Sequence, residues 1–130
     1  MAAQRVKIKK EPSPDHPIVI EPTPGRVVVS VAGRIIADSK TALTLRESDY
    51  SAVQYIPRSD VDMSLLVRSK HVTYCPYKGD CSYFDIVVGG LRSENAVWTY
   101  EDPFPSVAAI KDRLAFYPER VDSIQTDDSD

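Results

Sequence analysis

Short runs in which apolar and polar residues alternate dominate the central part of the chain. In residues 26–31 a valine occupies every second position, the period that places side chains on one face of a β-strand. Ala32-Gly33 predicts a tight turn into a second strand at residues 34–38, and a third strand is expected at residues 41–47. The pattern therefore predicts a three-stranded antiparallel meander.

The same alternation assigns side chains to the two faces of the third strand. Leu43 and Leu45 are expected to point into the core, whereas Thr44 points outward. A further short strand is predicted at residues 53–56 and ends at Pro57, because proline cannot donate a backbone hydrogen bond.

Only two segments favour helix. The first covers residues 60–67, with Ser59 or Asp60 as its cap, and the second begins at Ser106 and ends before Pro118. Both are too short to be stable unless they pack on a sheet. With no alternation of strands and helices, the sequence predicts a single, mainly β domain of antiparallel sheets and hairpins with one or two short helices.

The stretch from His71 to Val88 predicts a hairpin around the turn Lys78-Gly79-Asp80, because glycine and aspartate favour turns. The expected strands are residues 71–75 and 81–88, antiparallel. Their register pairs Cys75 with Cys81, Thr73 with Tyr83, and His71 with Asp85. One face of this hairpin is then polar and is either solvated or the wall of a site, whereas the other face is apolar and suited to the core.

Two aromatic residues share one face of a predicted strand at residues 96–100. These are Trp98 and Tyr100, and we expect the chain to reach them from a strand at 86–92 through a turn at 93–95. Gly89-Gly90 is interpreted as a bulge or a close backbone approach. Aromatic side chains on a strand belong either to a core or to a ligand site.

Composition and charge exclude several classes of protein. The chain has 130 residues, 42% of them hydrophobic and 27% charged, which is typical of one soluble domain. No apolar run is long enough to cross a bilayer, so no membrane partner is expected. A net charge of −3 argues against nucleic acid as a partner.

Two cysteines without a disulfide pattern predict a cytoplasmic protein, with a nuclear location left open. The oligomeric state is not determined by the sequence.

Charge and proline locate the edges of the domain. Residues 1–16 are rich in basic side chains and are expected to form a mobile arm, whereas residues 122–130 form an acidic tail. Five of the ten prolines fall between residues 12 and 24, so the lead-in to the domain should be extended. The single β domain is therefore assigned to residues 17–121.

The sequence gives little support for a metal site or for a nucleophilic catalytic pair. No Cys-x-x-Cys pair is present, so neither a metal site nor a cofactor is expected. His71 and Cys75 lie four residues apart on one strand, about 13 Å, which is beyond the reach of a catalytic pair. The two cysteines are interpreted as structural thiols that lie close enough to oxidise to each other.

Asp60-Val61-Asp62 matches the metal-binding Asp-x-Asp of nucleotidyltransferases. Those enzymes also need a Gly-Ser turn that holds phosphates, and this chain has no Gly-Ser dipeptide. Capping of a helix explains both aspartates equally well.

Several long motifs occur in an order that resembles one family. They read GRIIADSKTALTLRE, YIPRSDVDMSLL, HVTYCPYKGDCSYF, NAVWTYEDP and AFYPERVD. Together they resemble the family called "domain of unknown function 427", from about His16 to about Ile124. The resemblance implies a small β domain similar to the Mss4-like, or β-tent, folds, and the family is sometimes filed as nucleotidyltransferase-like. The family motif around the turn has a small residue such as alanine where this chain has Cys81, so a shared mechanism that uses Cys81 is not implied.

The main functional hypothesis is a pocket that binds or transforms a small molecule, with an anionic ligand as one alternative. Aromatic rings would stack on the ligand, and Arg58 and Lys78 would bind an anionic group. The expected ligand-binding residues are Tyr55, Arg58, Tyr74, Lys78, Tyr83, Trp98 and Tyr100, and the catalytic candidates are His71, Lys78 and Asp85. Whether the protein is an enzyme stays open.

The competing hypothesis is a non-catalytic module for protein interaction, in which the same aromatic side chains are buried in a dry core.

Overall fold

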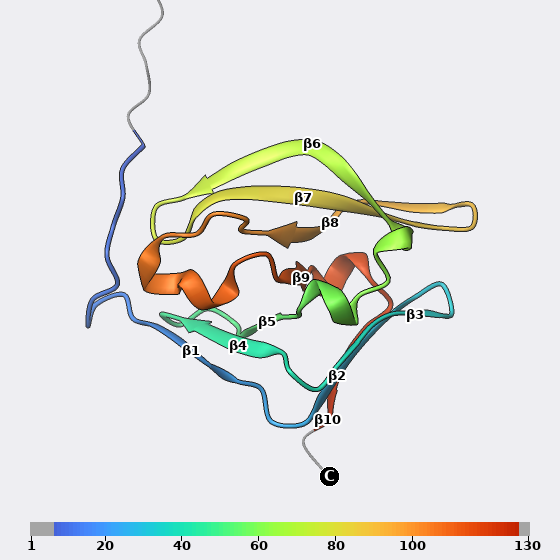
Figure 1. Ribbon diagram of the computed structural model, residues 1–130, viewed down its shortest axis with the longest axis horizontal. Helices are drawn as coiled ribbons and strands as arrows, with labels where there is room; N and C mark the ends of the chain where they lie inside the picture. The colour runs from blue at the N-terminus through green and yellow to red at the C-terminus, as the bar shows by residue number, and fades with distance from the viewer. Residues whose placement is uncertain (1–6, 128–130) are drawn as a thin grey trace, which may run out of the picture.

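The computed structural model describes residues 7–127, and within them strands are the main secondary structure (Figure 1). The strands are β1 (Ile18–Pro22), β2 (Arg26–Val31), β3 (Arg34–Ser39), β4 (Leu43–Glu47), β5 (Val53–Tyr55), β6 (Leu66–Cys75), β7 (Gly79–Val88), β8 (Leu91–Thr99), β9 (Leu114–Phe116) and β10 (Ser123–Asp127). The short 3-10 helices are η1 (Arg58–Asp60), η2 (Met63–Leu65), η3 (Pro105–Ile110) and η4 (Pro118–Arg120). The predicted mainly β class is confirmed.

The strands form three antiparallel sheets in two layers. The sheet β6-β7-β8-β9 lies at the top of Figure 1, and the sheets β1-β4-β5 and β10-β2-β3 lie side by side below it. Each lower sheet packs on a different part of the upper one, which creates two apolar clusters. The first cluster joins β2 and β3 to β7, β8 and β9, and the second joins β4 and β5 to β7, β8 and η3.

One backbone contact ties the upper layer to the lower one. Ile56 and Leu114 each donate a backbone N–H to the other's carbonyl oxygen at 2.8 Å, and both side chains are fully buried. Ile56 directly follows β5, and Leu114 begins β9. The sheet β1-β4-β5 is therefore joined to the edge of the four-stranded sheet.

The predicted meander is wrong in its third strand. The hairpin β2-β3 is present, and its turn has positive φ at both Ala32 and Gly33, as a type I′ turn requires. However, β4 pairs with β1 and β5, whereas β10 takes the free side of β2. Thr44, expected to point outward, is buried and shares a hydrogen bond of 2.8 Å with Thr23. The alternation of apolar and polar residues indicated each of these three strands, but it did not indicate which strands pair with one another.

The hairpin β6-β7 also departs from its predicted register. Cys75 pairs with Gly79 and Thr73 with Cys81, a shift of two residues, because the loop contains only residues 76–78. Gly79, expected within the turn, instead begins β7 with φ of +112°. A further irregularity between Arg68 and Val72 places Val67, and not His71, opposite Asp85.

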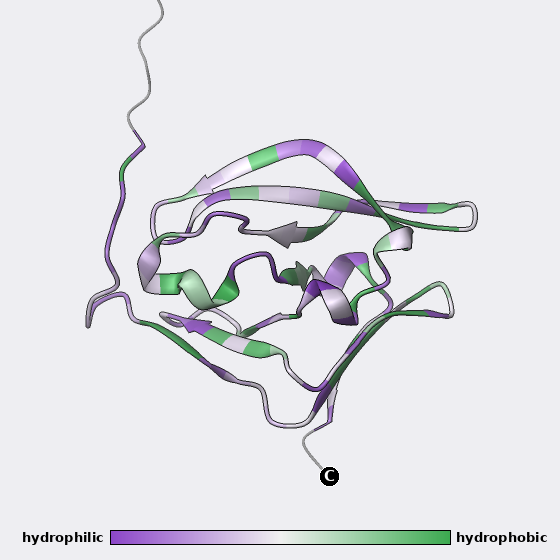
Figure 2. Ribbon diagram, viewed as in Figure 1, coloured by the Kyte–Doolittle hydropathy of each residue, from purple (hydrophilic) through white to green (hydrophobic). Residues whose placement is uncertain are grey.

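That irregularity lies on an outer edge. Residues 68–71 of β6 are hydrophilic, and Figure 2 colours this part of the strand purple. A bulged edge strand that carries charge resists pairing with other chains. Its partner β7 is mostly buried, and its pairing with β8 has a second irregularity between Phe84 and Ile86. Before this irregularity the inward side chains are Cys81 and Tyr83, and around it they become Phe84 and Ile86. Cys81 and Tyr83 therefore face the core and not a solvated polar face.

Two further local predictions require correction. Gly89-Gly90 forms the turn between β7 and β8, so the expected turn at residues 93–95 lies inside β8. The predicted helices are short 3-10 turns, and their caps differ from those expected. Residues 114–116, expected at the end of the second helix, instead form the strand β9. Pro57 precedes η1, Asp62 caps η2 by accepting from Ser64, and Phe104 precedes η3.

Both ends of the described chain contact the domain. Residues 123–127, predicted to belong to the acidic tail, form β10. Of the predicted arm, residues 1–6 lie outside the described residues, and the rest runs along the body. Lys10 donates its backbone N–H to the carbonyl oxygen of Pro76 at 2.8 Å, and Tyr74 donates its hydroxyl to the carbonyl oxygen of Ile8 at 2.7 Å.

Gly79 provides a test of the observed hairpin. An alanine there would adopt φ of +112° and place its Cβ 3.4 Å from the carbonyl oxygen of Asp102. We expect Gly79→Ala to lower the free energy of unfolding by about 1–3 kcal/mol. Gly90→Ala is the matched control, since a Cβ there meets nothing within 4 Å, and it should stay within about 0.5 kcal/mol of the wild type. Urea denaturation measures both, and equal effects would contradict the register.

Candidate functional site

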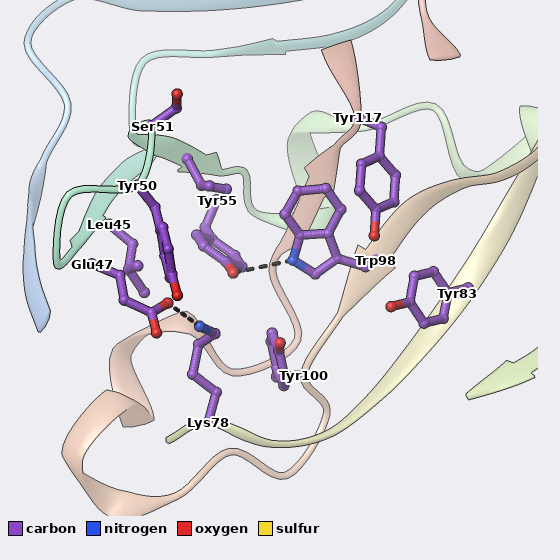
Figure 3. Close-up of a pocket in the computed structure, with 11 residues that line it drawn as sticks. Leu45, Glu47, Tyr50, Ser51, Tyr55, Lys78, Tyr83, Trp98, Tyr100 and Tyr117 are labelled. Carbon is purple, nitrogen blue, oxygen red and sulfur yellow. Dashed lines mark hydrogen bonds and ion pairs between the residues drawn. The ribbon is translucent and has the colours of Figure 1, made fainter. Parts of the chain in front are cut away.

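A cavity of about 230 Å³ lies between the sheet β1-β4-β5 and the strands β7 and β8 (Figure 3). Six aromatic side chains surround it, namely Tyr50, Tyr55, Tyr83, Trp98, Tyr100 and Tyr117. The remaining lining residues are Leu45, Glu47, Ser51, Val53 and Lys78. We call this cavity the aromatic pocket.

The rings of the pocket are held by one another. The Trp98 indole N–H donates a hydrogen bond of 3.1 Å to the Tyr55 hydroxyl, and the two rings meet edge to face (Figure 3). The Tyr117 ring lies 4.4 Å from Trp98, centroid to centroid. Tyr83 shares a hydrogen bond of 2.9 Å with the hydroxyl of Thr73. These contacts fix the orientation of the Tyr55, Trp98 and Tyr83 rings.

One end of the pocket carries a buried ion pair. The Lys78 ammonium binds the Glu47 carboxylate, and each side chain is only 10% exposed (Figure 3). The other Glu47 oxygen lies 2.7 Å from His16 Nε2, whose ring stacks on Tyr77 at 4.0 Å. Lys78 Nζ also lies 5.9 Å from the centre of the Tyr100 ring. Glu47 thus joins the N-terminal arm, β4 and the β6-β7 loop.

The surroundings set the charge states in the pocket. Burial by itself raises the pKa of Glu47, but the hydrogen bonds from Lys78 and His16 outweigh it and hold that pKa below its usual value. Burial raises the pKa of Tyr55, Tyr83 and Tyr100, so these phenols keep their protons at neutral pH. The pocket consequently offers hydroxyl and ammonium donors on aromatic walls.

Five residues named from the sequence meet at this pocket. Tyr55 comes from β5, Lys78 from the loop after β6, Tyr83 from β7, and Trp98 and Tyr100 from β8 and its end. They lie far apart along the chain and converge because the Ile56–Leu114 bridge brings β5 to the edge of the upper sheet.

Two of the expected ligand-binding residues lie elsewhere. Arg58 donates to Asp112, Thr99 and Glu101, and its only described ion pair is with Glu101 at 2.9 Å. It therefore does not join Lys78 in an anion clamp at the aromatic pocket. Tyr74 lies against the N-terminal arm, with Lys7 and Phe104 close to its ring.

The remaining catalytic candidates do not form a pair. The His71 ring is exposed and lies 4.6 Å from the ring of Tyr83. Asp85 is buried, accepts from the Asn95 backbone N–H at 2.8 Å and forms an ion pair with Arg92 at 2.7 Å. Burial raises the pKa of Asp85, but these partners outweigh it and hold the pKa below its usual value. The contacts of Asp85 are thus those of a structural carboxylate.

Sequence reasoning missed Glu47 and His16, and also the pocket rings of Tyr50 and Tyr117. Residue 47 shares its strand face with Leu43 and Leu45, so the period of two already placed a carboxylate toward the core. A carboxylate that points toward the core needs a cation beside it, so an ion pair at residue 47 could have been predicted from the sequence. No pattern in the sequence predicted the position of His16, because its approach to Glu47 depends on the path of the arm.

The cysteines and aspartates that suggested other chemistry have ordinary surroundings. Cys75 and Cys81 are both free thiols, and the observed register does not place them opposite each other. Asp60 accepts hydrogen bonds from Ser39 and Thr41. Within residues 7–127, no group of three or more His, Cys, Asp or Glu side chains is arranged to hold a metal ion.

Comparison with known families assigns the sequence to one family. Residues 19–127 match the family described as "Domain of unknown function (DUF427)", and because the match covers most of the chain, the protein belongs to that family. No curated protein matches the sequence. Among the described residues, no helix is long and apolar enough to cross a membrane.

The lowered pKa of Glu47 predicts how stability depends on pH. Since the carboxylate is favoured in the folded state, its contribution is present above the unfolded pKa near 4.5 and is lost as pH falls through the lower folded pKa. We expect urea midpoints of the wild type to fall more steeply below about pH 4.5 than those of Glu47→Gln. Parallel curves would show that Glu47 is not held as a charged group.

The ion pair itself can be tested by a double-mutant cycle. Lys78→Met leaves the Glu47 carboxylate without its buried ammonium, so the free energy of unfolding should fall by about 3 kcal/mol. Adding Glu47→Gln should restore more than about 1 kcal/mol of that loss. The exposed pair of Lys111 and Asp112 is the control, where Lys111→Met should cost less than about 0.5 kcal/mol. Additive effects of the two pocket substitutions would contradict a direct pair.

Proposed function

We propose that the aromatic pocket binds a small molecule that has a planar ring and an acceptor or anionic group. The observation that carries this proposal is the convergence of six aromatic rings on one cavity with Lys78 at its end. A volume of about 230 Å³ is below the roughly 300–1,000 Å³ typical of pockets for drug-sized ligands, so a ligand of one ring suits it.

The donors of the pocket support an acceptor group on the ligand. A lysine ammonium has three N–H donors, and one of them binds Glu47. Tyr55 accepts from Trp98 with its hydroxyl oxygen and so keeps its own O–H for a ligand. Because Glu47 already matches the charge of Lys78, one carboxylate on the ligand is the largest negative charge that the pocket would accommodate.

Two other functions have less support. A protein-interaction module would present an apolar patch, whereas the exposed large apolar side chains of the described residues lie on different elements, such as Val19 on β1, Ile35 on β3 and Val72 on β6. A nucleotidyltransferase would need metal-binding aspartates, and Asp60 and Asp62 instead bond to neighbouring Ser and Thr residues. The likeness to β-tent folds, some of which bind small ligands, stays a prediction and agrees with the proposal.

Benzoate is a suitable first probe, and Trp98 reports on it because it is the only tryptophan of the chain. We expect saturable changes in Trp98 fluorescence with benzoate. Tyr50→Ala should weaken binding by up to about tenfold, because it removes a stacking surface from the pocket wall. Tyr50 is 63% exposed, so this variant should fold normally.

The control is Val72→Ala, which removes an equally exposed side chain outside the pocket. It should bind benzoate like the wild type. If benzoate and a panel of single-ring heterocycles all fail to change the fluorescence of Trp98, the proposed function is wrong.

A further inference from the structure

A second cavity, of about 560 Å³, lies beside the aromatic pocket, between the sheet β10-β2-β3 and residues 51–56, which include β5, with the end of β9 as a further wall. Val29, Ile56 and Phe116 form its deep wall, and their exposed fractions are 0%, 0% and 4%. Residues at its mouth are polar or exposed, among them Asp122 and Ala52. We call it the apolar cavity.

The two cavities share part of their lining. Ser51, Val53 and Trp98 belong to both. Ser51 and Val53 lie at the start of β5, which is an edge strand because it pairs only with β4 in its sheet. The Trp98 indole and this edge of β5 therefore separate the aromatic pocket from the apolar cavity.

Three polar side chains of the apolar cavity are already hydrogen-bonded within the protein. Asp122 accepts from the Ala32 backbone N–H at 2.7 Å, and Ser123 shares a hydrogen bond of 2.7 Å with Ser30. Gln54 accepts from Thr23 at 2.6 Å. What the cavity offers a ligand is therefore mainly apolar surface, whereas ammonium and phenol donors lie in the aromatic pocket.

From this division we propose that the ligand is amphipathic, with an acceptor-bearing ring in the aromatic pocket and an apolar tail that passes Trp98 into the apolar cavity. This inference rests on the proposed function and names the class of molecule that would fill both spaces. The apolar cavity suits a tail of several carbons, because its volume lies within the roughly 300–1,000 Å³ of ordinary ligand sites.

The test compares benzoate with 4-butylbenzoate by titration of Trp98 fluorescence. Each buried methylene should tighten binding about fourfold, so the butyl compound should bind at least about tenfold more tightly. Ala52→Phe adds a ring at an exposed position that lines the apolar cavity alone. It should remove the gain from the butyl group and leave the affinity for benzoate unchanged. Ala109→Phe is the matched control, because Ala109 is exposed and lines neither cavity, and it should change neither affinity.

The outcomes separate this inference from the proposed function. If benzoate binds and the butyl group adds nothing, or its gain persists in Ala52→Phe, the tail does not occupy the apolar cavity and this inference alone is overturned. If neither compound binds, the ring-binding function fails and the inference fails with it. If only 4-butylbenzoate binds and Ala52→Phe abolishes its binding, the tail occupies the apolar cavity and the inference is supported, because the ring alone then binds too weakly to be measured.

Discussion

The exchange of two backbone hydrogen bonds between Ile56 and Leu114 is the contact on which the geometry of this protein depends. It joins the edge of a lower sheet to the edge of the upper sheet in a dry setting, where unpaired backbone groups would be costly. The contact fixes the separation of β5 and β8, and with it the distance between Tyr55 and Trp98. The aromatic pocket exists because two sheets that meet at this edge diverge beyond it.

The Glu47–Lys78 pair is the second determinant of the site. Burying either charge alone would be costly, so the two side chains and His16 must meet in the folded protein. Their contacts bring the β6-β7 loop and the N-terminal arm to the end of β4. The charges of the pair nearly cancel, so the aromatic pocket presents hydrogen-bond donors on aromatic walls. The same two residues thus fix the local structure and carry the binding role that we propose.

Much of the local structure could be predicted from the sequence. Alternating valines in β2, the Ala32-Gly33 turn and the short β5 before Pro57 were recognised because each depends on neighbours within a few residues. The aromatic side chains of β8 were recognised as candidates for a site on the same grounds. Glu47 could also have been recognised, since its inward position follows from the same period of two.

Pairing between distant segments could not be obtained in this way. The placement of β10 beside β2 and of β4 in another sheet depends on contacts between segments far apart in sequence. The register of β6-β7 depends on the length of its loop and on a bulge, which the alternation of residues does not reveal. The path of the arm, which brings His16 to Glu47, and the pairing of Arg58 with Glu101 have the same origin. By itself the sequence indicated the strands from β2 to β8, whereas it assigned β1 to an extended lead-in, β9 to a helix and β10 to a tail. It also indicated which aromatic residues were candidates for a site. Only the tertiary structure decided which of them share a cavity, because a cavity is defined by elements that meet across space.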